Sequence, residues 1–209
     1  MIDLVLPEDR ITFATPLLEM HRDRKSVFVD RLGWDLPSRG SWLEIDRFDD
    51  EFAVYLLARS PEDGRHLASL RLLPTTRPHL LNSVFLNLCE EGAPTGECIW
   101  EISRLLTTPH VRTGQSALKL HRLLALALAE FASLNDVSAF TLVIEASRLP
   151  ALLSIGWTII PLGLPTIVKG QELVALSIDA SPASLASLRA RLQLAGPALR
   201  ARALMRSAA

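Results

Sequence analysis

GQSALKLHRLLALALAEFASLN, residues 114–135, is the stretch that decides the fold of this chain. It is apolar on nearly every side, which is typical of a helix buried within a protein. Strand-like segments flank it, with CIWEISRLL (98–106) before it and AFTLVIEA (139–146) after it. Strands joined through one long helix form right-handed parallel crossovers in nearly all known sheets. The sequence therefore predicts a parallel strand pair and a groove where the two strands separate.

Further helices and strands are predicted on both sides of this unit. No repeat or low-complexity block interrupts the chain, so we expect residues 1–209 to form a single domain. The order of helix, strands, central helix, strands and helix favours an α/β fold, a three-layer sandwich with a mixed central sheet. The other predicted elements are a helix at 15–32, strands at 52–59, 66–74 and 173–179, and a helix at 181–195 that begins after Ser181.

Composition excludes several classes of protein. The formal net charge of −1 lacks the basic excess that phosphate binding requires, so no nucleic-acid partner is expected. The longest apolar run, at 123–132, is far shorter than the ~20 residues of a membrane-spanning helix, so no membrane insertion is expected. The first ten residues, MIDLVLPEDR, lack the basic start of a secretory signal. We expect a cytoplasmic protein.

Metal binding and nucleophilic catalysis receive little support from the residue pattern. Cys89 and Cys98 lack the neighbouring cysteines and histidines of a zinc motif, so no metal is expected. No Gly-x-Ser-x-Gly elbow or other Ser/His/Asp signature is present. Packing or solvated positions are the favoured interpretation for the five histidines, His21, His66, His79, His110 and His121.

Two charged residues, Glu101 and Arg104, stand inside the apolar segment IWEISRLL. In a regular strand Glu101 and Ser103 share one face and Arg104 points to the other. Both charges can reach one site only if the strand bulges, and bulges are common beside active sites. We therefore expect regular pleating to fail between residues 101 and 104.

Other charged residues recur in apolar or aromatic surroundings: Arg24, Asp46, Asp49 and Arg71. Together with Glu101 and Arg104 they make a balanced set of three arginines and three carboxylates. Two interpretations stay open at this point. The set is either a buried ion network that holds the fold or the polar lining of a pocket for a zwitterionic ligand.

Four blocks of the sequence resemble the signature blocks of acyl-homoserine-lactone synthases, the autoinducer synthases of bacterial quorum sensing. Order, gaps and residue types all agree, mainly over the first half of the chain. The blocks are RKSVFVDRLGWDLP (24–37), EIDRFDD (44–50), SLRLLPTTRPHLL (69–81) and WEISRLL (100–106). The positions that match the near-invariant set of the family are Arg24, Phe28, Trp34, Asp46, Asp49, Arg71, Glu101 and Arg104.

This resemblance implies a fold similar to the GNAT-type N-acyltransferases and an acyltransferase activity. In the implied reaction an acyl group passes from the thioester of acyl carrier protein to the amine of S-adenosylmethionine. The methionyl carboxylate then displaces methylthioadenosine and closes the lactone. S-adenosylmethionine is a substrate here, and neither a metal nor a further cofactor is implied.

Physical chemistry suggests roles for the matching residues. Arg24 and Arg104 would hold the carboxylate end of S-adenosylmethionine, and carboxylates such as Asp46 and Asp49 would face its cationic groups. Phe28 and Trp34, with Arg71 nearby, would wall the same substrate site. Glu101 is the candidate base that takes the proton of the amine, with Ser103 and Arg104 as further candidate catalytic residues.

The acyl chain needs an apolar pocket, which the resemblance places at the strand 139–146. Thr141 and Val143 share one face and Leu142 and Ile144 the other, and either pair could line the pocket. In the family a threonine or serine on this strand tends to accompany 3-oxo chains, and Thr141 is the candidate for that residue, with the oxidation state of the acyl chain left open. A basic surface for docking the carrier protein would include Arg112, Arg148 and Lys169.

Two other functions fit the same fold. One is a general N-acyltransferase that uses acyl-coenzyme A (acyl-CoA) and another amine, although it leaves the EIDRFDD block unexplained. The other is a non-catalytic acyl-binding protein in which the charges form a structural network. The acyl chain length, the choice between carrier protein and CoA, and the oligomeric state remain open from the sequence.

Overall fold

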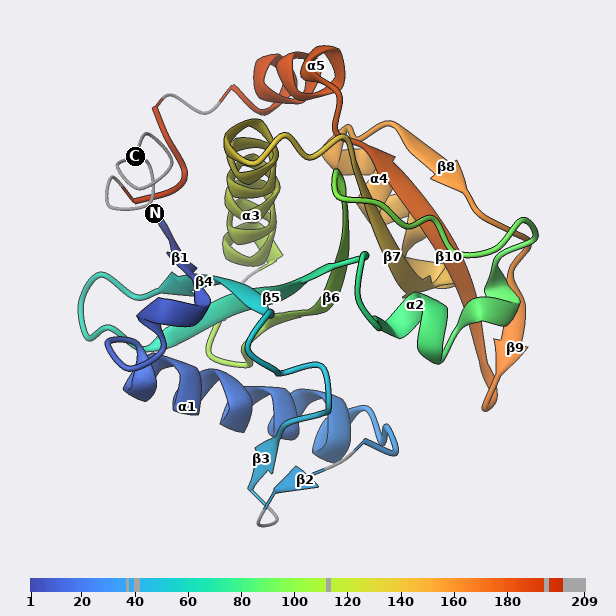
Figure 1. Cartoon of the computed structure of the whole chain (residues 1–209). Helices are drawn as coiled ribbons and strands as arrows, with labels where there is room; N and C mark the ends of the chain where they lie inside the picture. Colours follow the sequence, from blue (N-terminus) through green and yellow to red (C-terminus); the bar gives the residue numbers. More distant parts are fainter. Residues whose placement is uncertain (37, 40–41, 112–113, 194–195, 201–209) are drawn as a thin grey trace.

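A mixed β-sheet runs through the centre of the computed structural model, which describes residues 1–36, 38–39, 42–111, 114–193 and 196–200. The strands of this sheet are β1 (Ile2–Val5), β4 (Val54–Arg59), β5 (His66–Pro74), β6 (Ile99–Thr107), β7 (Ala139–Glu145), β8 (Ile159–Pro161), β9 (Thr166–Val168) and β10 (Gln171–Asp179). Their order is β1-β4-β5-β6-β7-β10-β8, and β9 also pairs with β10 (Figure 1). A separate two-stranded ribbon consists of β2 (Ser38–Arg39) and β3 (Leu43–Glu44).

Helices cover both faces of the sheet, so the expected three-layer sandwich is confirmed (Figure 1). One face carries α3 (Gly114–Leu134), α4 (Leu149–Ile155) and α5 (Pro182–Leu192). The other carries α1 (Ala14–Arg24), its π-helical continuation η2 (Lys25–Arg31) and α2 (Leu80–Ser83). Single 3₁₀ turns occupy Pro7–Asp9, Leu86–Leu88 and Ala146–Arg148.

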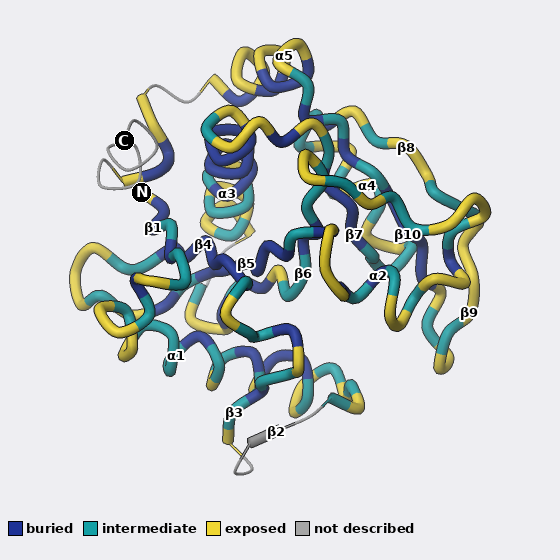
Figure 2. The backbone as a smooth tube through the Cα atoms, in the orientation of Figure 1, coloured by how far each residue is buried: buried dark blue, intermediate teal, exposed yellow. Residues whose placement is uncertain are grey.

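The crossover predicted around 114–135 is present, and it is the only parallel pairing between the named strands of the described chain. β6 and β7 run parallel and α3 connects them. Residues 124–132 of α3 are all buried, in line with an apolar pattern that leaves no face for solvent (Figure 2). Alanines alternate with leucines there, and their small side chains let the helix approach the sheet closely.

β6 leaves regular pairing on both of its edges. Its register with β7 covers only Ile99–Ile102, after which the two strands separate. On the β5 side, Arg71 lies opposite Ser103 and Ser69 lies opposite Leu106, so β6 carries one extra residue there. Arg104 has a φ of 52°, a left-handed conformation that costs free energy for a residue other than glycine. The expected break in pleating is confirmed, with Arg104 as its first irregular residue.

Other elements differ in detail from the sequence prediction. The predicted helix 15–32 is present, but its last part, Lys25–Arg31, is π-helical. Short strands at the sheet margins, β1, β8 and β9, were not predicted because three or four residues show too little alternation. No helix in the described ranges has the length and apolar character needed to span a membrane.

Candidate active site

Six buried charged side chains form a closed ring in which arginines and carboxylates alternate. Arg24 comes from the end of α1, Arg71 from β5 and Arg104 from the irregular part of β6. Three positive and three negative charges cancel, which offsets the cost of removing each from water. The N–O distances around the ring are 2.5 Å for Arg24–Glu44, 3.0 Å for Glu44–Arg104, 2.7 Å for Arg104–Asp46, 2.6 Å for Asp46–Arg71, 2.9 Å for Arg71–Asp49 and 2.8 Å for Asp49–Arg24.

Hydrogen bonds within the loop after β3 hold its aspartates so that they face the arginines. Asp46 Oδ1 accepts the backbone N–H of Phe48 at 2.8 Å, and Asp49 Oδ2 accepts that of Asp46 at 2.9 Å. Such side-chain to backbone bonds are the reason aspartate favours turns. Asp49 also accepts the Tyr55 hydroxyl at 2.9 Å. The carboxylates therefore stabilise their own loop and the ring together.

Charge pairing keeps Asp46, Asp49 and Arg24 of the ring ionised. Burial alone would raise the pKa of Asp49, but the guanidinium groups of Arg24 and Arg71 hold it well below its usual range. Asp46 is lowered in the same way, against burial, by Arg71 and Arg104. Burial would lower the pKa of Arg24, but Asp49 and Glu44 raise it. All of these groups carry their charges at neutral pH.

Glu44 is the ring member that the sequence analysis missed. The expected third carboxylate was Glu101, which has no ion-pair partner in the described part of the chain. Glu44 instead bridges Arg24 and Arg104 and is fully buried. The signal was present in EIDRFDD, because Glu44 and Asp46 are two residues apart and share one face of an extended segment.

Glu101 lies beside the ring, against the start of α2. Its two oxygens accept the backbone N–H groups of Leu80 at 2.9 Å and Leu81 at 2.6 Å. Burial raises the pKa of Glu101 to about 7, although these two N–H groups act in the opposite direction. A carboxylate with a pKa near neutral can take up and release a proton under ordinary conditions.

Ser103, Phe28 and Trp34 complete the group that was expected from the sequence. Ser103 Oγ accepts the Arg71 Nε–H at 3.0 Å, on the sheet face that carries Glu101. Phe28 and Trp34 stack with ring centroids 4.9 Å apart, and Arg104 lies 5.8 Å from the Phe28 centroid. The turn at Gly33, which follows η2 and has a φ of 67°, brings the two rings together, and the Trp34 N–H donates to the Phe28 carbonyl there. Trp34 Nε1 is buried and has no hydrogen-bond partner among the described residues.

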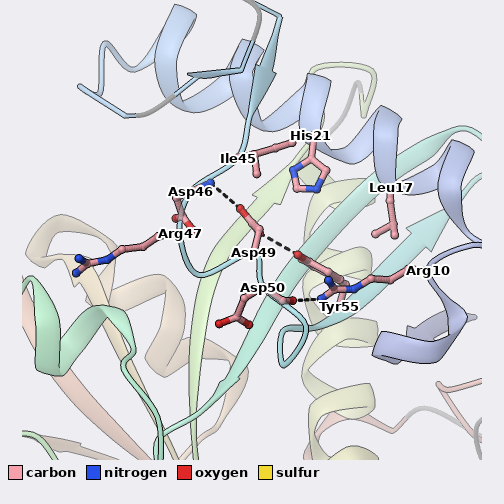
Figure 3. Close-up of a pocket in the computed structure, with 9 residues that line it drawn as sticks. All are labelled: Arg10, Leu17, His21, Ile45, Asp46, Arg47, Asp49, Asp50 and Tyr55. Atoms are coloured by element: carbon pink, nitrogen blue, oxygen red, sulfur yellow. Dashed lines mark hydrogen bonds between the residues drawn. The ribbon is translucent and has the colours of Figure 1, made fainter.

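A cavity of about 390 Å³ lies between α1 and the loop after β3, and borders Asp46 and Asp49 of the ring (Figure 3). Figure 3 shows Asp49 between the Asp46 backbone and the Tyr55 hydroxyl. Burial lowers the pKa of His21, whose Nδ1 bonds the Glu44 carbonyl. Besides the two ring aspartates, none of the lining residues was predicted: Arg10, Leu17, His21, Ile45, Arg47, Asp50 and Tyr55.

The four candidates for the acyl pocket divide between the two faces of β7. Thr141 is fully buried, lies next to Glu101 in the β6–β7 register, and its Oγ1 has no hydrogen-bond partner in the part of the chain that the structure describes. Val143 packs on the same side with Leu81. Leu142 and Ile144 pack into the core beneath α3. Only Thr141 and Val143 share a face of the sheet with Glu101.

Two of the three candidate docking residues lie in the described ranges, and each is near a different carboxylate. The Arg148 side chain is 66% exposed and lies 3.6 Å from Glu145. Lys169 is 77% exposed and lies 3.5 Å from Asp35. Arg112 lies outside the described residues. In the described ranges, no cluster of three or more His, Cys, Asp or Glu side chains could hold a metal ion.

Comparison with known proteins identifies the family. Residues 10–188 match the family model described as autoinducer synthase. The isovaleryl-homoserine lactone synthase of Bradyrhizobium diazoefficiens is 34% identical over 193 residues, which cover 92% of this chain and 85% of that protein. The solved CoA-dependent acyl-homoserine lactone synthase BjaI, with S-adenosylmethionine and isopentyl-CoA, is 29% identical and superposes with a TM-score of 0.85 over 100% of this chain and 98% of its own.

A more distant structure shows the fold alone. An acyl-CoA N-acyltransferase from Pseudomonas aeruginosa, 20% identical, has a TM-score of 0.55 over 85% of this chain and 97% of its own. The GNAT-like architecture expected from the resemblance is therefore confirmed. Since the family model spans most of the sequence and the relatives align over nearly their whole length, this chain belongs to the autoinducer synthase family of acyltransferases.

Proposed function

We propose that this chain acylates the amine of S-adenosylmethionine from a thioester and then closes the acyl-homoserine lactone. The observation that carries the proposal is Glu101, a buried carboxylate with a pKa of about 7 that lies beside a neutral ring of charges. Glu101 takes one proton from the substrate ammonium, and the free amine then attacks the thioester carbonyl. The amide bond forms, and the thiol leaves with a proton.

Lactone closure needs no further group from the protein. The methionyl carboxylate attacks the γ-carbon, the carbon–sulfur bond breaks, and methylthioadenosine leaves as a neutral thioether. Placing the carboxylate and the sulfonium in line is then the contribution of the site.

The ring edge and the aromatic stack suit S-adenosylmethionine. The side chains of Arg104 and Asp46, each 7% exposed, are the most accessible members of the ring, and one guanidinium and one carboxylate can meet a zwitterion. The Phe28–Trp34 stack beside Arg104 offers ring faces to a sulfonium. Trp34 Nε1 supplies a buried N–H that is free to donate.

The unpaired edge of β6 suits the thioester. Its register with β7 ends at Ile102, so backbone N–H groups beyond that residue do not donate to β7. Such N–H groups stabilise the oxyanion that forms when an amine attacks a thioester. Glu101 lies within the paired part of the same strand.

For the thioester we favour acyl-CoA over the carrier protein that the resemblance implied. The solved relative BjaI is described as CoA-dependent with isopentyl-CoA, and the Bradyrhizobium relative is named for an isovaleryl product. Arg148 and Lys169 each lie near a carboxylate, which weakens the case for a shared basic surface that would dock a carrier protein.

The purified chain, incubated with S-adenosylmethionine and either isovaleryl-CoA or isovaleryl carrier protein, tests the proposal. We expect mass spectrometry to detect isovaleryl-homoserine lactone and equimolar methylthioadenosine with the CoA donor. Product from the carrier protein alone would reverse the donor assignment and leave the reaction intact. Acyl binding without methylthioadenosine release from either donor would exclude the synthase function.

Thr141 is proposed to recognise an oxygen substituent on the acyl chain. Its buried, unpartnered hydroxyl lies next to Glu101 in register and can bond an oxygen at the third carbon. Thr141→Val keeps the shape but removes that bond, so we expect the kcat/KM ratio of 3-oxo to unsubstituted acyl donors to fall about tenfold. Thr141→Ser, which keeps the hydroxyl, is the matched control. An unchanged ratio in Thr141→Val would rule out this role.

A further inference from the structure

Three buried polar atoms that have no hydrogen-bond partner in the described ranges belong to neighbouring residues of β5 and the end of β6: His66 Nε2, Ser69 Oγ and Thr108 Oγ1. The three residues are 0%, 1% and 2% exposed. Buried polar side-chain atoms have a hydrogen-bond partner in the large majority of cases, either in the protein or in ordered water. Three such atoms on neighbouring strands point to a site for a small polar molecule if they share one face of the sheet.

Strand register brings the three residues to one face. His66 and Ser69 lie on β5, and His66 faces α1 because its ring bonds Asp23. Ser69 lies opposite Leu106, which packs against Val27 and Phe28 on the same side. Thr108 comes two residues after Leu106, and its N–H bonds the Leu67 carbonyl of β5 at 2.9 Å. Alternation along the extended chain therefore turns its side chain toward that face as well.

Hydrogen-bonding chemistry identifies the occupant. His66 Nδ1 lies 2.7 Å from Asp23 Oδ2, and since a carboxylate only accepts, Nδ1 carries the proton. Nε2 then accepts when the ring is neutral and donates when it is charged, and the two hydroxyls can each donate or accept. A water molecule donates two hydrogen bonds and accepts others, so it fits one ring nitrogen and two hydroxyls.

The same histidine fastens α1 to the sheet. Its backbone N–H donates to Glu19 Oε2 at 3.2 Å, so two carboxylates of α1 hold one residue of β5. Asp23 directly precedes Arg24, the ring arginine that α1 supplies. A shift of α1 along the sheet would therefore move Arg24 relative to Glu44 and Asp49.

We propose that one buried water, held by His66, Ser69 and Thr108, completes a polar clamp with Asp23 that sets the position of α1 and thus of Arg24. His66 is then a positioning residue for the S-adenosylmethionine site, a role that rests on the proposed function. The water itself does not depend on that function.

A high-resolution crystal structure of the full chain tests the water directly. We expect one ordered water within hydrogen-bond distance of His66 Nε2 and both hydroxyls. In the double variant Ser69→Ala, Thr108→Val that water should be absent. A direct bond between His66 and either hydroxyl, with no water, would overturn this part of the proposal.

Substrate affinity tests the positioning role. His66→Leu removes both ring nitrogens, and we expect the Kd for S-adenosylmethionine, measured by calorimetry, to rise at least about tenfold. His66→Gln, which can both donate and accept, should recover most of that loss. Leu188→Ala on the opposite face is the control for lost stability alone, because Leu188 packs α5 into the core on the α3 side of the sheet. We expect it to leave the Kd unchanged.

Further measurements distinguish a failure of the clamp from a failure of the proposed function. If His66→Leu does not fold, Asp23→Asn weakens the same contact at a partly exposed position, and an unchanged Kd in that variant would exclude the clamp. Wild-type affinity in a folded His66→Leu variant would exclude it as well. If the wild-type chain did not bind S-adenosylmethionine, that result would instead contradict the proposed function.

Discussion

Glu101→Gln is expected to lower kcat for acyl transfer by about 10²- to 10⁴-fold, the range typical of a lost general base. The amide keeps the size of the side chain but cannot take the proton of the substrate amine. It also cannot accept from both Leu80 and Leu81, since only one end of an amide is an acceptor. Release of methylthioadenosine, followed by chromatography, measures the rate.

Glu130 offers a matched control for the structural part of this effect. It is also a buried glutamate whose oxygens accept two successive backbone N–H groups, those of Ala198 and Leu199. It lies on α3, on the face away from the ring. Glu130→Gln should lower stability by a similar mechanism and leave kcat unchanged. Equal loss of kcat in both variants would show that Glu101 acts only through the fold.

The pH dependence of the wild-type chain supplies a second measurement of the same role. Folding raises the pKa of Glu101 from an ordinary 4.5 to about 7, so the protonated form is favoured in the folded state. Its contribution to stability is complete below pH 4.5 and is lost as the pH rises through about 7. Activity follows the opposite course, because only the ionised form is a base. The ¹³C shift of the Glu101 carboxyl, assigned with Glu101→Gln, should titrate near 7.

Arg24→Met is expected to lower the free energy of unfolding by about 3–5 kcal/mol, the typical cost of breaking a buried ion pair. Arg24 is fully buried, and its removal leaves Glu44 and Asp49 each with one guanidinium fewer. Thermal melts followed by circular dichroism should show a fall in Tm of about 10 °C for a chain of this length.

A double variant tests whether the ring stabilises the fold through its charge balance and not through packing alone. Arg24→Met with Asp49→Asn removes one charge of each sign, so this double variant should recover part of the stability that Arg24→Met loses. Arg189→Met is the control, since Arg189 pairs with Glu130 but its side chain is 48% exposed, and such pairs contribute about 0–1 kcal/mol. An unchanged melting curve for Arg24→Met would contradict the ring as a structural element.

Local pattern was sufficient for the main elements of the fold. The apolar run in α3 and the strand segments around it are properties of neighbouring residues, so the parallel crossover could be predicted from them. The break in β6 could also be predicted, because Glu101 and Arg104 in one apolar strand demand a common polar site. The π-helical turn at Lys25–Arg31 could not, since its pattern differs little from that of an α-helix.

Pairing between distant residues required the tertiary structure. Sequence identified a balanced set of arginines and carboxylates, but it named Glu101 where the ring contains Glu44. It left open whether the set was a network or a pocket lining, and the closed ring supports the network for Arg24, Asp49 and Arg71. Charge and residue type say that a buried arginine needs a carboxylate, but not which one.

The sequence by itself determined the α/β architecture and the charged residues that had to be neutralised, because these follow from composition and short-range spacing, and the resemblance of four blocks indicated the family. Only the tertiary structure decided that Glu101 stands apart at the start of α2 and that His66 meets Asp23 across the sheet. Coulomb attraction and hydrogen bonding depend on distances of a few ångströms in space. The folding of the whole chain sets those distances, and residues far apart in the sequence then become partners.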